Sequence, residues 1–211
     1  MDTIIKQLHW RYAVKQYDNT QKAGHDQLQL LKDAIQLAPS SFGLQPFRVL
    51  FVEDPDTREK LRQASFNQSQ ITDASCLVVF AIENTIDEEL VNKYFRQLCQ
   101  VRNMHLEGGL LKHYESVVNS INRKTAEEKK AWATHQAYLA LGVLLVAAAA
   151  SGIDANPMEG FISAAYNDIL GLTDMGLNAV VIAAVGYRHP DDFFQRLPKV
   201  RKPAEELFIQ R

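Results

Sequence analysis

The stretch from Thr125 to Phe161 constrains the fold more than any other part of the chain. Thr125 and Glu128 match the capping box that begins a helix, and residues 137–150 carry no charged side chain. A helix that is apolar on every side must be buried over most of its surface. The uncharged run is shorter than the roughly 18 apolar residues that a membrane span requires. We therefore expect it to form the central helix of a globular domain.

The residues after this helix have the composition of a binding loop. The helix should end at Gly152, which can adopt the left-handed conformation. Pro157 has no N–H and a fixed φ, and Gly160 adds freedom three residues later. We interpret residues 153–160 as a stiff and then flexible loop that could place backbone N–H groups against a ligand. The helix alone is also compatible with a plain structural role.

The bulk properties of the 211-residue chain point to one domain, residues 1–211, with a real core. The chain has 25 acidic and 23 basic residues and a pI near 6.3. This balance gives no basic field for nucleic acid or for an anionic membrane surface. The first residues do not resemble a signal peptide, and Cys76 and Cys99 lack metal or redox spacing. We expect a cytoplasmic protein.

The pattern of apolar residues indicates an α+β protein. Three apolar runs predict strands at residues 47–52, 76–82 and 179–186. Helical periodicity predicts helices over residues 3–11, 25–37, 56–64, 87–103, 110–121 and 162–170, with Asp56 and Asp87 as caps of the third and fourth. Simple βαβ neighbours are few, so we expect three layers rather than a doubly wound Rossmann sheet. Residues 207–209 look like a strand without a local partner, which could join a neighbouring subunit's sheet.

Motifs for several common chemistries are absent from the sequence. It contains no Gly-x-Gly-x-x-Gly, phosphate-binding P-loop, Gly-x-Ser-x-Gly or His-Glu-x-x-His. Metal catalysis and covalent serine chemistry are therefore poor candidates. Two cation pairs remain, Arg11 with Lys15 and Lys199 with Arg201. They could converge on one phosphate, or they could simply be solvated surface charges.

Five segments carry a family resemblance, and they cover essentially the whole chain: residues 11–18, 39–47, 73–80, 153–161 and 197–203. In their order and spacing the chain resembles the flavin-dependent nitroreductase family, specifically its branch of oxygen-insensitive NAD(P)H nitroreductases and dihydropteridine reductase-like proteins. The resemblance implies a three-layer sandwich with a mixed, mostly antiparallel sheet. It also implies a domain-swapped homodimer, in which residues from about 200 to 211 extend onto the partner and FMN occupies two interface clefts. An all-apolar helix and an unpaired C-terminal strand independently favour the dimer.

The resemblance also implies which residues hold FMN. Arg11, Lys199 and Arg201 match positions that grip the phosphate. Lys15 and Asn67 match side chains at the pyrimidine edge of the flavin ring.

The remaining implied contacts come from two loops. The segment 157–160 matches the loop that faces the flavin, with the N–H of Glu159 directed at N5. Ser40, Ser41 and Gln45 match a loop supplied by the partner subunit. The full implied cofactor site is Arg11, Tyr12, Ala13, Lys15, Ser40, Ser41, Gln45, Asn67, Gln70, Pro157, Met158, Glu159, Gly160, Lys199 and Arg201.

The implied substrate pocket lies under a mobile helix, residues 110–119. Its residues are Phe42, Tyr114, Val117 and Val118. The resemblance implies no metal and no catalytic side chain: hydride passes from NAD(P)H through flavin N5 to a nitroaromatic, quinone or similar small electrophile by a ping-pong mechanism. A cation such as Lys15 would stabilise the negative charge that reduction places near N1 and O2.

Three departures from the family pattern matter. Ala13 replaces a serine of some relatives, and Gln70 replaces a lysine, which we expect to make bound FMN slightly harder to reduce. Val117 and Val118 stand where aromatic rings are common, so stacking on an acceptor should be weaker.

Three alternatives stay open at this stage. The chain could bind or destroy flavin without NAD(P)H reductase activity, or it could be an α+β interaction module without a cofactor. Within the family, it could be a dedicated reductase of a natural quinone, enone or pteridine. Neither the acceptor nor the choice between NADH and NADPH follows from the sequence.

Overall fold

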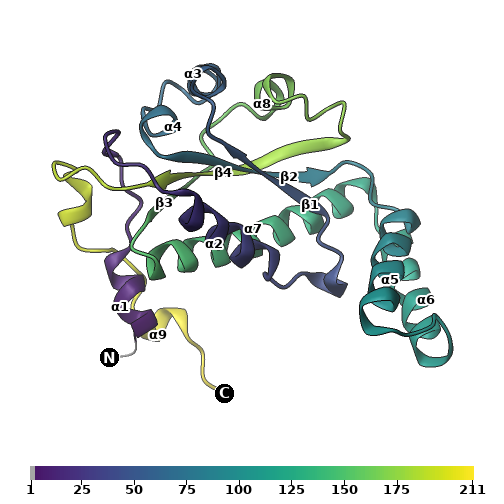
Figure 1. Ribbon diagram of the computed structural model, residues 1–211. Coiled ribbons are helices and arrows are strands. Elements are labelled where there is room, and N and C mark those ends of the chain that lie inside the picture. The colour runs from purple at the N-terminus through teal and green to yellow at the C-terminus, as the bar shows by residue number, and fades with distance from the viewer. Residues whose placement is uncertain (1–2) are drawn as a thin grey trace.

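A four-stranded antiparallel sheet forms the middle layer of the computed structural model, which describes residues 3–211 (Figure 1). The strands are β1 (Phe47–Val52), β2 (Cys76–Glu83), β3 (Asp154–Met158) and β4 (Leu177–Gly186), in the order β1-β2-β4-β3. Met1 and Asp2 belong to the predicted single domain of residues 1–211 but lie outside the described residues. The three-layer α+β fold is confirmed. The described strands pair only antiparallel, so a mixed sheet would need a further strand.

Nine α-helices and two 3₁₀ turns are assigned in residues 3–211, and the α-helices cover both faces of the sheet. They are α1 (Thr3–Trp10), α2 (His25–Gln36), α3 (Pro55–Gln63), α4 (Gln70–Asp73), α5 (Glu88–Arg102), α6 (Gly108–Asn122), α7 (Ala126–Ala150), α8 (Ser163–Ile169) and α9 (Ala204–Leu207), with 3₁₀ turns η1 (Ser41–Gly43) and η2 (Phe194–Arg196). Asp87 caps α5 as predicted. The cap of α3 is Asp54, not Asp56, because Pro55 takes the first helical position.

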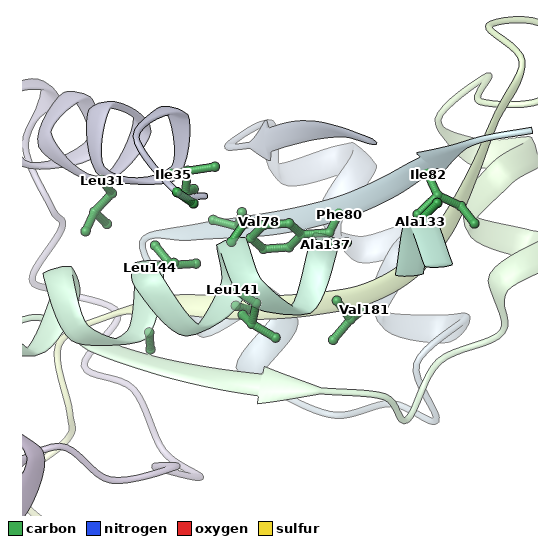
Figure 2. Packing of buried hydrophobic residues seen from close by; sticks show 14 of the residues in the cluster. Leu31, Ile35, Val78, Phe80, Ile82, Ala133, Ala137, Leu141, Leu144 and Val181 are labelled. Atoms are coloured by element: carbon green, nitrogen blue, oxygen red, sulfur yellow. The ribbon is translucent and has the colours of Figure 1, made fainter. Parts of the chain in front are cut away.

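Helix α7 packs along one face of the sheet and forms the centre of the larger core cluster (Figure 2). Its capping box joins Thr125 and Glu128 as predicted. Small side chains such as Ala133 and Ala137 let the helix approach Val78 and Phe80 of β2 closely. The helix has 25 residues, and by length and composition alone it could cross a membrane. Its packing against the sheet identifies it instead as a core helix.

Residues 154–158 form the edge strand β3, so the loop predicted at this place is wrong over most of its length. Pro157 pairs in register with Ala183 of β4. An edge strand tolerates proline because the missing N–H can face away from the sheet. The irregular segment begins only at Glu159. Before β2, Gln70 begins the short helix α4.

The C-terminal residues do not form the predicted strand in the single chain. Residues 204–207 make the short helix α9, and the tail beyond it has no regular structure. Leu207, Phe208 and Ile209 are all exposed. Extension of this tail onto a partner subunit therefore stays a prediction.

Candidate functional site

Three cations gather where α1 ends. Arg11 follows that helix directly, and it lines a cavity of about 640 Å³ together with Lys199 and Arg201 of the C-terminal segment. Lys199 Nζ donates hydrogen bonds to the carbonyl oxygens of Leu8 at 2.6 Å and His9 at 2.7 Å. Lys199 thus caps the carbonyl end of α1, whose partial negative charge would otherwise repel an anion. Two of its three N–H donors are used there, and one remains for a ligand.

The guanidinium of Arg11 is half-buried and has no hydrogen-bond partner among residues 3–211. Burial lowers its pKa, and the positive charge of Arg201 lowers it further. The pKa of Lys199 is likewise lowered by burial and then by Arg11 and Arg201. A half-buried cation without an acceptor, such as Arg11, is costly unless something compensates its charge. The cluster has the charge and donor geometry for a phosphate group.

An ion pair fixes the cation cluster to the start of β3. Arg188 donates to the Asp154 carboxylate at 2.6 and 2.7 Å. It also donates to the Trp10 carbonyl oxygen at 3.2 Å and lies 4.1 Å from the centroid of the Trp10 ring. Burial raises the pKa of Asp154 despite the arginine. This pair joins the end of α1, and hence Arg11, to the edge strand.

The other end of β3 meets the turn that precedes α4. Gln68 Nε2 donates to the carbonyl oxygen of Gly160 at 2.8 Å. Phe66 and Asn67, the two preceding residues, both adopt the left-handed conformation with φ of 54° and 58°. Two such residues in sequence store backbone strain, which is characteristic of binding sites. The turn places Asn67 beside the segment that contains Glu159.

Several polar groups of β3 and of the predicted cofactor site lack a partner within residues 3–211. Asn156 Nδ2, halfway along the strand, is fully buried and unpaired. The Gln70 side chain is only 7% exposed and makes no hydrogen bond. The side chains of Lys15 and Asn67 and the N–H of Glu159 are also free. Lys15 and Glu159 are exposed and Asn67 is half-buried, so these three can bond to water, whereas buried polar groups are normally paired. The two buried amides are therefore the groups that favour a polar ligand.

The distance along β3 suits an elongated ligand with an anionic end. From Asp154, beside the cations, to Met158 the strand spans on the order of 13 Å at the usual rise per residue. One end offers positive charge, and the other offers amide donors from Glu159 and Asn67. Tyr12 and Ala13, which follow Arg11, are half-buried in the same N-terminal segment.

The predicted loop residues Ser40, Ser41 and Gln45 lie elsewhere in the single chain. The N–H of Ser41 donates to Gln136 Oε1 of α7 at 2.8 Å. From Gln136 to the C-terminal end of α7, where α1 lies, the helix rises roughly 20 Å (Figure 1). One chain therefore does not bring this loop to the cation cluster. Its contribution to a partner's site stays a prediction.

The predicted substrate pocket is only partly supported by the positions of its residues. Phe42 has a left-handed φ of 58° and presents an exposed ring. Tyr114 Oη lies 2.7 Å from Asn92 Oδ1 of α5, which anchors α6 to that helix. Val118 is half-buried. Val117 is fully buried in the core cluster of the single chain, and its assignment to the pocket stays a prediction.

Four further residues of this region were not predicted from the sequence. Phe66 and Gln68 stand in an unremarkable polar turn, Asn156 in the presumed loop, and Tyr138 in the apolar run of α7. The Tyr138 hydroxyl donates to the Glu159 carboxylate across 21 residues. Tyr138 and Glu159 also line an open cleft of about 490 Å³ between α7 and the end of β3. Local composition carries no signal for contacts of this kind.

Fold and site together describe an α+β sandwich with a cluster of cations at one end of its edge strand. The sequence matches the model of the nitroreductase family over residues 8–187. The chain belongs to the nitroreductase family, and the resemblance drawn from its five segments is confirmed.

Curated relatives match along nearly the whole chain. YfkO of Bacillus subtilis is 30% identical and the match covers 97% of this chain and 95% of YfkO. The oxygen-insensitive NAD(P)H nitroreductase of Enterobacter cloacae is 26% identical with 100% of both chains covered. The major NAD(P)H-flavin oxidoreductase of Aliivibrio fischeri is 29% identical, with 97% of this chain and 96% of the relative covered.

Solved structures share the fold. The B. subtilis protein ydfN superimposes with a TM-score of 0.88 at 22% identity, covering 98% of both chains. An Exiguobacterium sibiricum protein solved in complex with FMN has a TM-score of 0.84 at 19% identity, covering 100% of this chain and 98% of that chain. These likenesses extend from α1 to the C-terminal segment.

Proposed function

We propose that this protein is an FMN-dependent oxidoreductase that transfers a hydride from NAD(P)H to a nitroaromatic, a quinone or a similar small electrophile. Membership in the nitroreductase family and the activities named for its relatives support this class. The observation that carries the proposal is the unpaired Arg11 guanidinium beside Lys199 and Arg201, near the strand β3 on which the buried Asn156 amide is also unpaired.

The described residues fit the two ends of FMN. Arg11, Lys199 and Arg201 would hold the phosphate through charge-assisted hydrogen bonds, which are stronger than neutral ones. Lys15 and Asn67 would meet the polar edge of the flavin ring. Gln70 would meet it too, and its buried amide would then gain the hydrogen bonds it lacks within this chain.

When bound, FMN supplies the hydride chemistry, and the protein supplies binding, orientation and electrostatics. The N–H of Glu159 would donate a hydrogen bond at the reacting edge of the ring. Lys15 would hold positive charge near the pyrimidine side, where negative charge develops on reduction. Gln70 supplies no charge at its position, so the reduced form should be less stabilised than in relatives that carry lysine there.

The proposed assembly is a cytoplasmic homodimer of single-domain subunits, with the segment from about residue 200 to 211 reaching onto the partner. Helix α7 supports this assembly, because Tyr138, Leu139 and Gly142 leave an apolar strip of it exposed in the single chain. The loop from Ser40 to Gln45 would then reach the partner's FMN site. This arrangement accounts for its distance from the cation cluster in its own chain.

An anaerobic absorbance spectrum before and after addition of NADH, and then NADPH, tests the function directly. A yellow protein whose flavin bands bleach is the expected result. A yellow protein that does not bleach with either nucleotide would indicate a flavin-binding protein without reductase activity. A colourless protein that also fails to take up added FMN would leave only a cofactor-free module. Once bleaching is observed, reoxidation by a nitroaromatic, a quinone and an enone in separate cuvettes compares the acceptors.

A further inference from the structure

A tyrosine of the central helix holds the segment that follows β3. The Tyr138 hydroxyl donates a hydrogen bond to Glu159 Oε1. Burial raises the pKa of Tyr138 to about 12, and the bond to Glu159 contributes to that rise. The hydroxyl therefore stays protonated, and remains a donor, throughout the physiological pH range.

A glutamine holds the same segment from the opposite side. Gln68 Nε2 donates to the carbonyl oxygen of Gly160 at 2.8 Å and to that of Ser65 at 3.1 Å. The segment after β3 packs closely against the turn before α4, since a Cβ added at Gly160 would lie 3.1 Å from Gln68 Nε2. Adjacent residues of one short segment are thus anchored to α7 on one side and to the turn before α4 on the other.

Between these two anchors lie backbone donors that nothing within residues 3–211 uses. The N–H groups of Glu159 and Gly160 make no hydrogen bond, whereas the next N–H, of Phe161, bonds to the Glu159 carbonyl oxygen at 2.9 Å. Donors that are fixed in direction before a ligand arrives bind more strongly, because no reorganisation is needed on binding.

We propose that Tyr138 is a positioning residue: through the Glu159 carboxylate it fixes the direction of the Glu159 and Gly160 N–H groups, and the affinity for FMN depends on this anchor. The inference rests on the proposed function, since it takes FMN to be the ligand along β3. Tyr138 itself need not touch the cofactor. The Glu159 side chain matters as a hydrogen-bond acceptor, and its negative charge does not.

The test measures FMN binding to the full-length apoprotein by quenching of flavin fluorescence. Tyr138→Phe should raise the dissociation constant about 3- to 10-fold, the effect of one lost hydrogen bond between partly exposed groups. Glu159→Ala should have the same effect, and the Tyr138→Phe/Glu159→Ala double variant should be no worse than either single one. Glu159→Gln keeps the acceptor oxygen and should bind FMN as the wild type does.

A matched control comes from the same helix. Thr134, one turn before Tyr138, bonds only to the carbonyl oxygen of Lys130, so Thr134→Val should leave the dissociation constant unchanged. Failure of the wild-type apoprotein to bind FMN would overturn the proposed function. If the wild type binds but Tyr138→Phe does not weaken binding, or the Tyr138 and Glu159 effects add, the anchor is refuted and the function stands. Loss of affinity in Glu159→Gln equal to that in Glu159→Ala would also refute it.

Discussion

Replacing Arg11 by alanine should change the apoprotein and the FMN complex in opposite ways. In the free protein the guanidinium is half-buried and unpaired within the described chain, and burial and then the charge of Arg201 lower its pKa. Its removal therefore relieves repulsion and desolvation and breaks no hydrogen bond. In the complex it should donate to the FMN phosphate, so the same change removes a charge-assisted bond.

The two effects have different sizes. A substitution that breaks no contact usually changes the free energy of unfolding by about 0.5 kcal/mol or less, which for a chain of this length is roughly 2 °C in Tm. A hydrogen bond to a charged group is worth roughly 1.5 to 3 kcal/mol. Its loss corresponds to about 10- to 150-fold weaker FMN binding. The stabilisation of the protein by excess FMN should fall by the same free energy, or about 3 to 12 °C.

Thermal melts of the Arg11→Ala apoprotein with and without FMN, together with a fluorescence titration, measure all three quantities. Arg102→Ala serves as the control, because Arg102 is an exposed arginine of α5 with no contact to the cation cluster. An apoprotein destabilised by more than about 5 °C would show that Arg11 has a structural partner. Wild-type affinity for FMN would show that the phosphate binds elsewhere.

Four other perturbations test separate parts of the structure. Arg58→Met should destabilise the protein by roughly 2 to 4 kcal/mol in urea unfolding, because the buried guanidinium bonds three backbone carbonyl groups at the end of α4; a change below about 1 kcal/mol would refute this. The pKa of buried Tyr166 is raised to about 12, so its stabilisation is complete below the unfolded pKa near 10 and is lost as pH rises towards 12, and Tyr166→Phe should flatten the decline in stability over that window. Leu139→Glu should shift the proposed dimer to monomers in analytical ultracentrifugation, whereas an unchanged dimer would place the interface elsewhere. Gln70→Lys should raise the flavin midpoint potential in a potentiometric titration, and an unchanged or lower value would contradict the charge argument.

The sequence was informative wherever structure depends on neighbouring residues. Strand β1 and the body of β2 follow from short apolar runs, and α7 from its capping box and apolar length. These features are local, so periodicity and capping rules suffice to find them. The cap of α3 was predicted too late in the chain, at Asp56, because Pro55 at the first helical position makes Asp54 the cap.

The sequence misled where neighbours in space outweigh neighbours in the chain. Pro157 reads as a loop residue, yet it lies in an edge strand because β4 provides pairing partners for residues 154–158. Residues 207–209 read as a strand, but a strand needs a partner, and the single chain offers none within residues 3–211.

In the candidate site, too, some features could be predicted from the sequence and others depend on tertiary contacts. Family motifs in the sequence identified the cations, the polar loop residues and the segment after the central helix. Only the tertiary structure connected Arg188 with Asp154, Gln68 with Gly160, and Tyr138 with Glu159. These contacts join residues separated by 21 to 92 positions. Residue type and local spacing determine which chemistry a chain can offer, whereas the packing of helices on the sheet decides which of those groups meet and which remain free for a ligand.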